Sequence, residues 1–298
     1  MKNGCPSADY SIHAMTETLL TIDCPDRVGL LARLTQFIAT RGGNLREVHQ
    51  FTEETSGWFF ARMAIETKTL SVTIPKLREE FSALGSELKA DWNIADHAQP
   101  KRTVLMVSQS GHCLADLLWR WRSGDLPMEI VAVVANHETF RSVVEREGLR
   151  FIHVPIAKET RAADFEKVGT LLRNLRAELV VLARYMQIIP ESLCTEFTGR
   201  IINIHHSFLP SFIGANPYKR AFERGVKLIG ATCHYVTPVL DEGPIIEQEV
   251  VRVEHFHNPD DLLRLGQDCE RLALARGLRY HLADRVLIHG NKTVVFRD

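Results

Sequence analysis

The sequence has no apolar stretch approaching the ~20 consecutive residues that a transmembrane helix needs, and it has almost no net charge. Its 36 Lys and Arg face 37 Asp and Glu, so the formal charge is −1. Without a basic surplus the chain lacks the field on which sequence-independent nucleic-acid binding depends. Residues 1–16 hold no apolar run before a small-residue cleavage site, and they predict a polar tail instead of a secretory signal. We therefore expect neither a membrane nor a nucleic acid as partner.

Cysteine is scarce as well, with six residues in 298 and no pair spaced as C-x-x-C. Structural zinc sites and disulfide frameworks depend on grouped cysteines, so we expect neither, and no metal. Free thiols without a secretory signal are typical of a reducing compartment and predict a cytoplasmic protein. Apolar residues make up 45% and charged residues 24%, the ordinary composition of globular proteins, and the length predicts about two domains of roughly 150 residues each.

The first domain is predicted over residues 17–95, after the tail. Asp26 follows a short turn and is expected to cap a helix whose apolar residues recur at helical spacing from Leu30 to Ile38. The whole pattern alternates as β-α-β-β-α-β, which predicts a ferredoxin-like α+β sandwich. Its remaining elements are strands at Thr18–Ile22, Asn44–Phe51, Trp58–Ala64 and Ala90–Ile94, and a second helix at Ile74–Leu88.

A polar linker over residues 96–102 precedes a second domain over residues 103–298. There, β-branched apolar runs alternate with helical stretches, which predicts a doubly wound, mostly parallel α/β sheet with ligands beyond the carboxyl ends of its strands. A long helix (Pro259–Arg276) and a hairpin that turns at Gly290 end the chain. The predicted strands are Thr103–Val107, Glu129–Ala135, Leu179–Leu182, Ile201–His205, Leu228–Val236 and Ile245–Val250, and the helices lie near Cys113–Arg122, Glu138–Glu147 and Ala163–Leu175.

Polar residues stand at the end of a strand that should be apolar on both faces. Asn203 and His205 are two positions apart, so their side chains share one face of the strand. Alone, the pair is most simply read as hydrogen-bonded polar groups at the sheet edge. Turn residues Pro210 and Gly214 follow, and a second strand ends in a Gly- and Pro-containing loop with Asp241. An amide, an imidazole and a carboxylate brought together could stabilise an oxyanion and move protons.

Four motifs resemble the folate-dependent formyltransferase family: N-x-H at 203–205, S-x-L-P at 207–210, G-A-T-x-H-Y-V at 230–236 and L-D-x-G-P-I-I-x-Q at 240–248. The segments 214–218, 225–237 and 285–296 are closest to the group within that family whose members hydrolyse 10-formyltetrahydrofolate. Thr21–Ala32 resembles the start of an ACT regulatory domain. The resemblance covers about residues 17–296. It implies an ACT domain followed by a catalytic domain that produces tetrahydrofolate and formate, a reaction of one-carbon metabolism beside purine biosynthesis.

The resemblance also implies roles for residues. Asn203, His205 and Asp241 would be catalytic and His234 would support them, with no cofactor or metal beyond the folate substrate. Backbone groups around three residues, Met186, Gln187 and Ile188, would bind the folate, although composition alone favours core packing for this apolar segment. Strand alternation is expected to turn His206 away from the catalytic residues.

The acceptor of the formyl group depends on residues 108–113. Family members that transfer the group to glycinamide ribonucleotide carry a Gly-Ser-Asn turn for the substrate phosphate, at a helix N-terminus. Here Gly111 is followed by His112 and Cys113, which leaves a loop for an anion or water and favours water as acceptor. Transfer to an amine such as glycinamide ribonucleotide and a non-catalytic folate or amino-acid sensor remain the alternatives.

The ACT-like turn offers a candidate effector site at Asp26, Arg27, Val28 and Gly29. As residues alone, the turn could be purely structural. ACT-like domains pair side by side and bind amino acids at their interface, so the resemblance implies methionine or glycine as effector. It also implies a homo-oligomer, a dimer or higher.

Overall fold

The computed structural model of the chain describes residues 17–210 and 217–297. The predicted tail over 1–16 and the predicted turn residue Gly214 lie outside these described residues. The chain divides into two compact units between Gln99 and Pro100.

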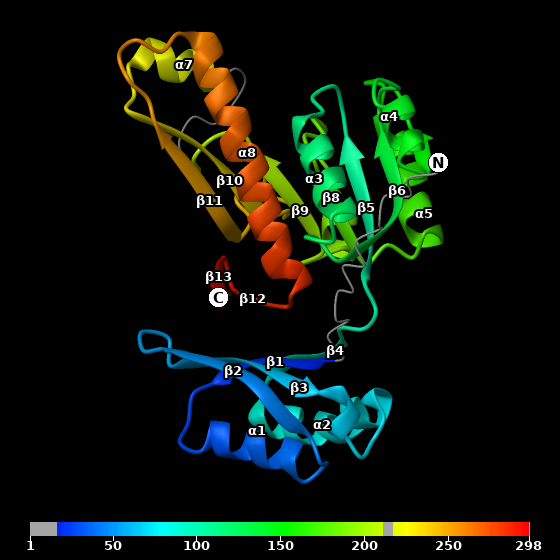
Figure 1. The fold of residues 1–298 in the computed structure, drawn as a ribbon, viewed down its shortest axis with the longest axis vertical. Helices are drawn as coiled ribbons and strands as arrows, with labels where there is room; N and C mark the ends of the chain where they lie inside the picture. The colour runs from blue at the N-terminus through cyan, green and yellow to red at the C-terminus, as the bar shows by residue number, and fades with distance from the viewer. Residues whose placement is uncertain (1–16, 211–216, 298) are drawn as a thin grey trace, which may run out of the picture. The chain divides into compact units, whose positions relative to one another are not determined.

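The first unit is a four-stranded antiparallel sheet in the order β2-β3-β1-β4, with two helices (Figure 1). Alternate residues of the strands, such as Leu20 and Ile22, pack with Leu34 and Phe81 of the helices, so both helices bury their apolar faces on the same side of the sheet. The predicted β-α-β-β-α-β order is confirmed. Its elements are β1 (Glu17–Pro25), α1 (Leu30–Ala39), β2 (Asn44–Glu53), β3 (Trp58–Glu66), the 3₁₀ turn Thr67–Thr69, α2 (Ile74–Leu88) and β4 (Asp91–Asp96).

The turn into α1 differs from the prediction. Strand β1 continues to Pro25, which pairs with Trp58, and the Asp26 backbone N–H donates to the Gly57 carbonyl at 2.8 Å. The residue at the N-cap is Gly29, with φ 87°, and no side chain caps the helix. Asp26 as helix cap is therefore wrong, because the strand pairing holds it three residues before the cap. The left-handed backbone at this position suits glycine.

The second unit is a seven-stranded sheet in the order β11-β10-β9-β8-β5-β6-β7. Strands β5 to β9 run parallel, while β10 runs antiparallel to both of its neighbours, β9 and β11, so the predicted mostly parallel sheet is confirmed. The elements are β5 (Lys101–Val107), α3 (His112–Arg122), β6 (Met128–Ala135), α4 (Arg141–Arg146), β7 (Phe151–His153), α5 (Arg161–Asn174), β8 (Leu179–Leu182), α6 (Glu191–Glu196), β9 (Ile201–His205), α7 (Pro217–Arg224), β10 (Leu228–Tyr235), β11 (Ile245–Arg252), α8 (Pro259–Leu282) and the hairpin β12 (Val286–His289) and β13 (Lys292–Val295).

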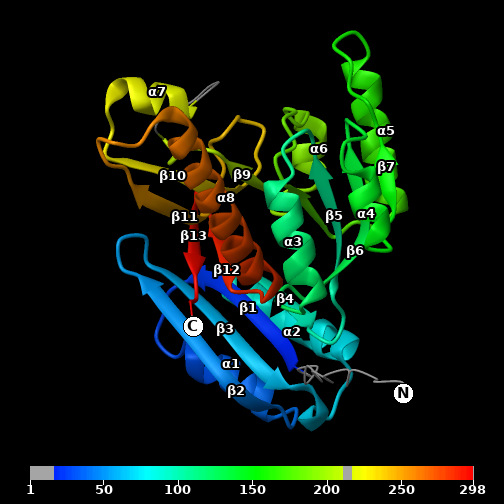
Figure 2. The ribbon, with the colours of Figure 1, turned by 45° about the horizontal axis from the view of Figure 1, so that its top comes forward.

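Helices cover both faces of this sheet. On one face α3, α4 and α8 pack in a core with alternate strand residues, and on the other α5 and α6 do the same. Figures 1 and 2 both show α8 running along β10 and β11. It extends six residues past its predicted end at Arg276, because Leu278 and Leu282 continue the buried face. Gly277 permits this course, since a Cβ there would lie 2.5 Å from Cys233 Sγ.

Short elements β7, α6 and α7 were not predicted. Within the described residues, no helix combines the length and apolar character needed to cross a bilayer.

Candidate functional site

The site begins where β9 and β10 pair. Their register places His234 opposite Asn203, and the Asn203 Nδ2 atom lies 3.2 Å from His234 Nε2. The other ring nitrogen, Nδ1, lies 2.9 Å from the Tyr235 carbonyl oxygen, which can only accept. His234 therefore carries its proton on Nδ1, and its Nε2 accepts from the Asn203 amide. One N–H of Asn203 is used in this way, and its side-chain orientation is fixed.

Asp241 reaches the same place from the loop between β10 and β11. The base of the loop is closed by a hydrogen bond from the Tyr235 N–H to the Pro244 carbonyl, 2.9 Å long. Gly243 is required there, since a Cβ would lie 1.8 Å from the Tyr235 carbonyl oxygen. At the far end of the loop Asp241 has φ 57°, a left-handed conformation that Asp tolerates better than most residues. Its Oδ1 lies 3.2 Å from His205 Nδ1 and 3.9 Å from His234 Nε2.

Charge in this cluster is set by burial and by the imidazoles. Burial alone would raise the pKa of Asp241, but the hydrogen bond from His205 and the neighbouring imidazoles lower it below its ordinary value. Burial lowers the pKa of His234, despite its hydrogen bond to Tyr235, so that ring is neutral near pH 7. Asp241 is thus an anion whose closest partner is His205.

His205 uses only one of its ring nitrogens. Nδ1 faces Asp241, whereas Nε2 is buried and has no hydrogen-bond partner. A buried polar atom without a partner is uncommon and is expected where a ligand completes the site. Asn203, His205, His234 and Asp241 all line one cavity of about 700 Å³.

His206 lines the cavity too, which corrects the prediction that it points away. Strand β9 ends at His205, so strand alternation no longer governs the next residue. The His206 ring stacks on that of His205 with centroids 5.1 Å apart. Burial first, then the nearby Arg184 and His205, lowers the pKa of His206 to about 4.

The segment after β8 forms another wall of this cavity. Met186 and Ile188 are 55% and 57% exposed although both are apolar, so core packing does not explain them. Arg161 donates to the Ile188 carbonyl at 2.6 Å and to Gln187 Oε1 at 3.3 Å, and Ser108 Oγ accepts from the Met186 N–H at 3.0 Å. These bonds fix the backbone and leave the apolar side chains of Met186 and Ile188 facing the cavity.

Known proteins share this architecture. A family model described as formyl transferase matches residues 101–278, and one described as ACT domain matches residues 18–74. Formyltetrahydrofolate deformylase of Synechocystis sp. is 48% identical over 282 residues, which are 95% of this chain and 99% of that protein. The chain belongs to the formyltetrahydrofolate deformylase family. The crystal structure of a formyltetrahydrofolate deformylase from Pseudomonas syringae pv. tomato matches with a TM-score of 0.93 and 51% identity over 94% of each chain.

A second kind of relative matches less of the chain. Glycinamide ribonucleotide transformylase 1 from Symbiobacterium toebii is 30% identical, with a TM-score of 0.62, and the match covers 66% of this chain and 95% of that one. Deformylases therefore match nearly the whole chain, whereas this transformylase lacks a counterpart for about a third of it.

Three residues beside the site of this deformylase-family chain were not predicted from the sequence. Arg184 and Tyr218 line the cavity, and Glu270 of α8 contacts both of them. Predicted loop residues Gly111 and His112 begin α3 and do not line the cavity; His112 Nε2 is instead bonded to Glu270 Oε2 at 2.8 Å. The one available signal was a glutamate on the buried face of an amphipathic helix, since Glu270 is 1% exposed.

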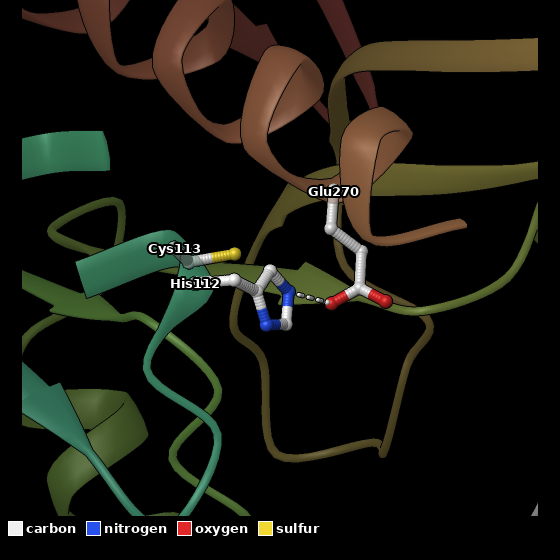
Figure 3. A group of neighbouring side chains, drawn as sticks. All are labelled: His112, Cys113 and Glu270. Atoms are coloured by element: carbon white, nitrogen blue, oxygen red, sulfur yellow. Dashed lines mark hydrogen bonds and ion pairs between the residues drawn. The ribbon is translucent and has the colours of Figure 1, made fainter. Parts of the chain in front are cut away.

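Figure 3 shows His112, Cys113 and Glu270 together, and their ligand-type atoms lie within 4.8 Å of one another. A nitrogen, a sulfur and an oxygen are ligands that zinc accepts. However, burial first and then the Glu270 charge raise the pKa of the Cys113 thiol well above its ordinary value. Arg184 Nε also lies 3.3 Å from Glu270 Oε2, so this carboxylate is already paired with a cation. The group suits an internal ion pair better than a metal.

The predicted effector residues lie in the first unit of the deformylase-family chain, in the turn between β1 and α1. Val28 is fully exposed, and Gly29 gives the turn its left-handed backbone. Arg27 Nη2 lies 4.0 Å from Glu87 Oε1 at the end of α2. Asp26, just before it, is held by its backbone hydrogen bond to Gly57. The turn is therefore a fixed, exposed feature of the ACT-like unit.

Proposed function

We propose that this chain hydrolyses 10-formyltetrahydrofolate to tetrahydrofolate and formate, as its deformylase relatives do. The observation that carries the proposal is the convergence of an amide, an imidazole and a carboxylate on one cavity, with a buried ring nitrogen of His205 left for a ligand. The apolar wall at Met186 and Ile188, beside Gln187, is suited to the face of the pterin ring.

The proposed chemistry starts with attack of water on the formyl carbon. As the carbonyl oxygen becomes an oxyanion, it receives hydrogen bonds from the second N–H of Asn203 and from Nε2–H of His205. Asp241, paired with Nδ1 of His205, stabilises the positive imidazole. His234 is a positioning residue, because its neutral Nε2 holds the Asn203 amide in place.

Two proton transfers complete the reaction. Asp241 is in position to orient the attacking water, and the proton that this water loses is passed through the Asp241–His205 pair to the leaving N10 as its bond to the formyl carbon breaks. The products are formate and tetrahydrofolate. The proposal requires no metal or other cofactor, since these side chains supply both the hydrogen-bond donors and the proton carriers.

Water is proposed as acceptor over an amine. The full-length match to deformylases supports this, as does the occupation of the α3 N-terminus by the His112–Glu270 pair. Incubating the protein with 10-formyltetrahydrofolate alone and measuring formate tests it. Release that requires added glycinamide ribonucleotide would favour formyl transfer, and binding of folate without any turnover would favour a sensor.

The ACT domain is proposed to bind an amino acid, methionine or glycine, at the Asp26–Gly29 turn, and to regulate the enzyme through a homo-oligomer. The exposed turn supports amino-acid binding, and the packing of both helices on one side of the sheet, which leaves the other side uncovered by helices of this unit, supports pairing. Formate release should change on addition of one of these amino acids, and sedimentation should give at least a dimer mass. An unresponsive monomer would contradict both parts. A cytoplasmic location belongs to the same proposal, because the cysteines of the described residues are free thiols, as is typical of a reducing compartment.

A further inference from the structure

A buried ion cluster adjoins the cavity at the start of α3. Glu270 Oε1 accepts from the Tyr218 hydroxyl at 2.7 Å, and Oε2 lies 2.8 Å from His112 Nε2 and 3.3 Å from Arg184 Nε. The carboxylate is 1% exposed and does not line the cavity, whereas Tyr218 and Arg184 do. Glu270 therefore stands directly behind the cavity wall.

The three side chains that contact this carboxylate, His112, Tyr218 and Arg184, are hydrogen-bond donors or cations. Arg184 is 14% exposed; its Nε is ion-paired with Glu270 without forming a hydrogen bond, and its Nη1 is buried without a hydrogen-bond partner. Helix α3 begins at His112, and neither a side-chain cap nor an acidic residue in its first turn offsets its dipole. Without Glu270, the Arg184 guanidinium in the cavity wall would lose its counterion, with the His112 imidazole and the α3 N-terminus behind it, an arrangement that favours an oxyanion.

We propose that Glu270 is a specificity-determining counterion: it neutralises Arg184 from behind the wall and so keeps oxyanions, and with them phosphorylated formyl acceptors, out of the cavity. The inference rests on the proposed function and deepens it, because it explains why water is left as the acceptor. Burial alone would raise the pKa of Glu270, but His112, Arg184 and Tyr218 lower it, so the counterion remains charged.

The backbone of Arg184 is held in place at this wall. Its φ is 65°, a left-handed conformation that is uncommon outside glycine, and its carbonyl accepts from the Ser108 N–H at 3.2 Å. Such a residue persists where its surroundings determine it strongly. Because Glu270→Gln keeps the shape of the side chain behind the wall, loss of the Glu270 charge should leave the Arg184 guanidinium beside the cavity without a counterion.

The test is Glu270→Gln, which keeps the shape and removes the charge. Formate release from 10-formyltetrahydrofolate is measured against inorganic phosphate at ionic strength held constant with KCl. In the parent protein, phosphate should leave KM unchanged. In the variant, the same phosphate concentrations should raise KM competitively, by about tenfold or more. Glu247→Gln is the matched control, because Glu247 is another buried carboxylate, paired with Arg297 and outside the cavity lining, and it should behave as the parent does.

Adding Arg184→Met to Glu270→Gln should abolish the phosphate inhibition, since the cation is then gone as well. Phosphate inhibition that survives in this double variant, or that is absent from a folded Glu270→Gln protein, would overturn the proposal. Calorimetry provides a readout that needs no turnover: heat of phosphate binding should be measurable with Glu270→Gln and not with the parent. Failure of the proposed function would instead show as a parent protein that releases no formate.

Calorimetry on the parent protein also keeps the proposal testable if the variant does not fold. Phosphate that binds the parent in competition with the folate substrate would overturn it. So would tight Zn²⁺ binding that Cys113→Ala removes, because the cluster of Figure 3 would then be a metal site instead of an ion pair.

Discussion

Replacing Asp241 with Asn tests the proposed chemistry most directly. The amide has nearly the same shape, so the closed loop should keep its conformation, but it cannot balance a positive imidazole or accept a proton. At the 3.2 Å between Oδ1 and His205 Nδ1, a charge pair is worth about 5 kcal/mol at an effective dielectric constant of about 20. Solvent reaches the carboxylate, which is 12% exposed, so this is an upper bound. General acid–base groups typically contribute 10²–10⁴-fold, and we expect kcat to fall about 10³-fold.

Three measurements on the one variant separate catalysis from structure: kcat from formate release, folate affinity from equilibrium binding, and Tm. Asp241→Asn should lower kcat and leave the other two close to those of the parent. Glu242→Gln is the control, since this neighbouring carboxylate belongs to the same loop and is exposed. A folded Asp241→Asn protein that retains more than about a tenth of the parent kcat would refute the assigned role.

Three further changes have defined outcomes. Met186→Glu should raise KM about tenfold or more with Tm unchanged, because burying a Met side chain against a ligand is worth about 1.5–3 kcal/mol, whereas Phe256→Glu, exposed and outside the cavity lining, should not alter KM. His206 stays neutral in the native protein down to its pKa of about 4, whereas in the unfolded chain it binds a proton below about pH 6.5. Its contribution to the free energy of unfolding is therefore complete above pH 6.5 and is lost as the pH falls toward 4. In denaturant titrations, the free energy of unfolding of His206→Gln should fall by about 2 kcal/mol less than that of the parent between these limits. Gly243→Ala should lower the free energy of unfolding by about 3 kcal/mol and lower kcat, since the added Cβ would meet the Tyr235 carbonyl oxygen. A variant with a lower Tm but an unchanged kcat would show that this loop does not position Asp241.

The fold was accessible from sequence where the apolar pattern was regular. The buried runs of β8 and β9 and the period of α2 defined those elements, because each buries one face or both along its whole length. The short elements were not accessible: β7 has three residues and α6 has six, too few to show a period. At the start of α1, the sequence offered Asp26 as a plausible cap, and only the pairing of β1 with β3 excludes it.

The site was partly accessible for a related reason. Asn203 and His205 stood out as polar residues in an apolar strand, and the structure brings them to Asp241 and His234 as the motifs implied. His206 required knowledge of where β9 ends. Glu270 had no local signal beyond its place on a buried helix face, because its partners come from three distant segments of the chain.

The spacing of these residues along the chain has a consequence for biosynthesis. Asn203 and His234 are 31 positions apart, whereas His112 and Glu270 are 158 apart. As the chain leaves the ribosome, β9, β10 and the Asp241 loop can therefore assemble before α8 exists. Until α8 is made, Arg184 and the start of α3 have no carboxylate to neutralise them. With Glu270 in the proposed role, packing of α8 is thus the step that neutralises Arg184 and gives the nascent cavity its final charge.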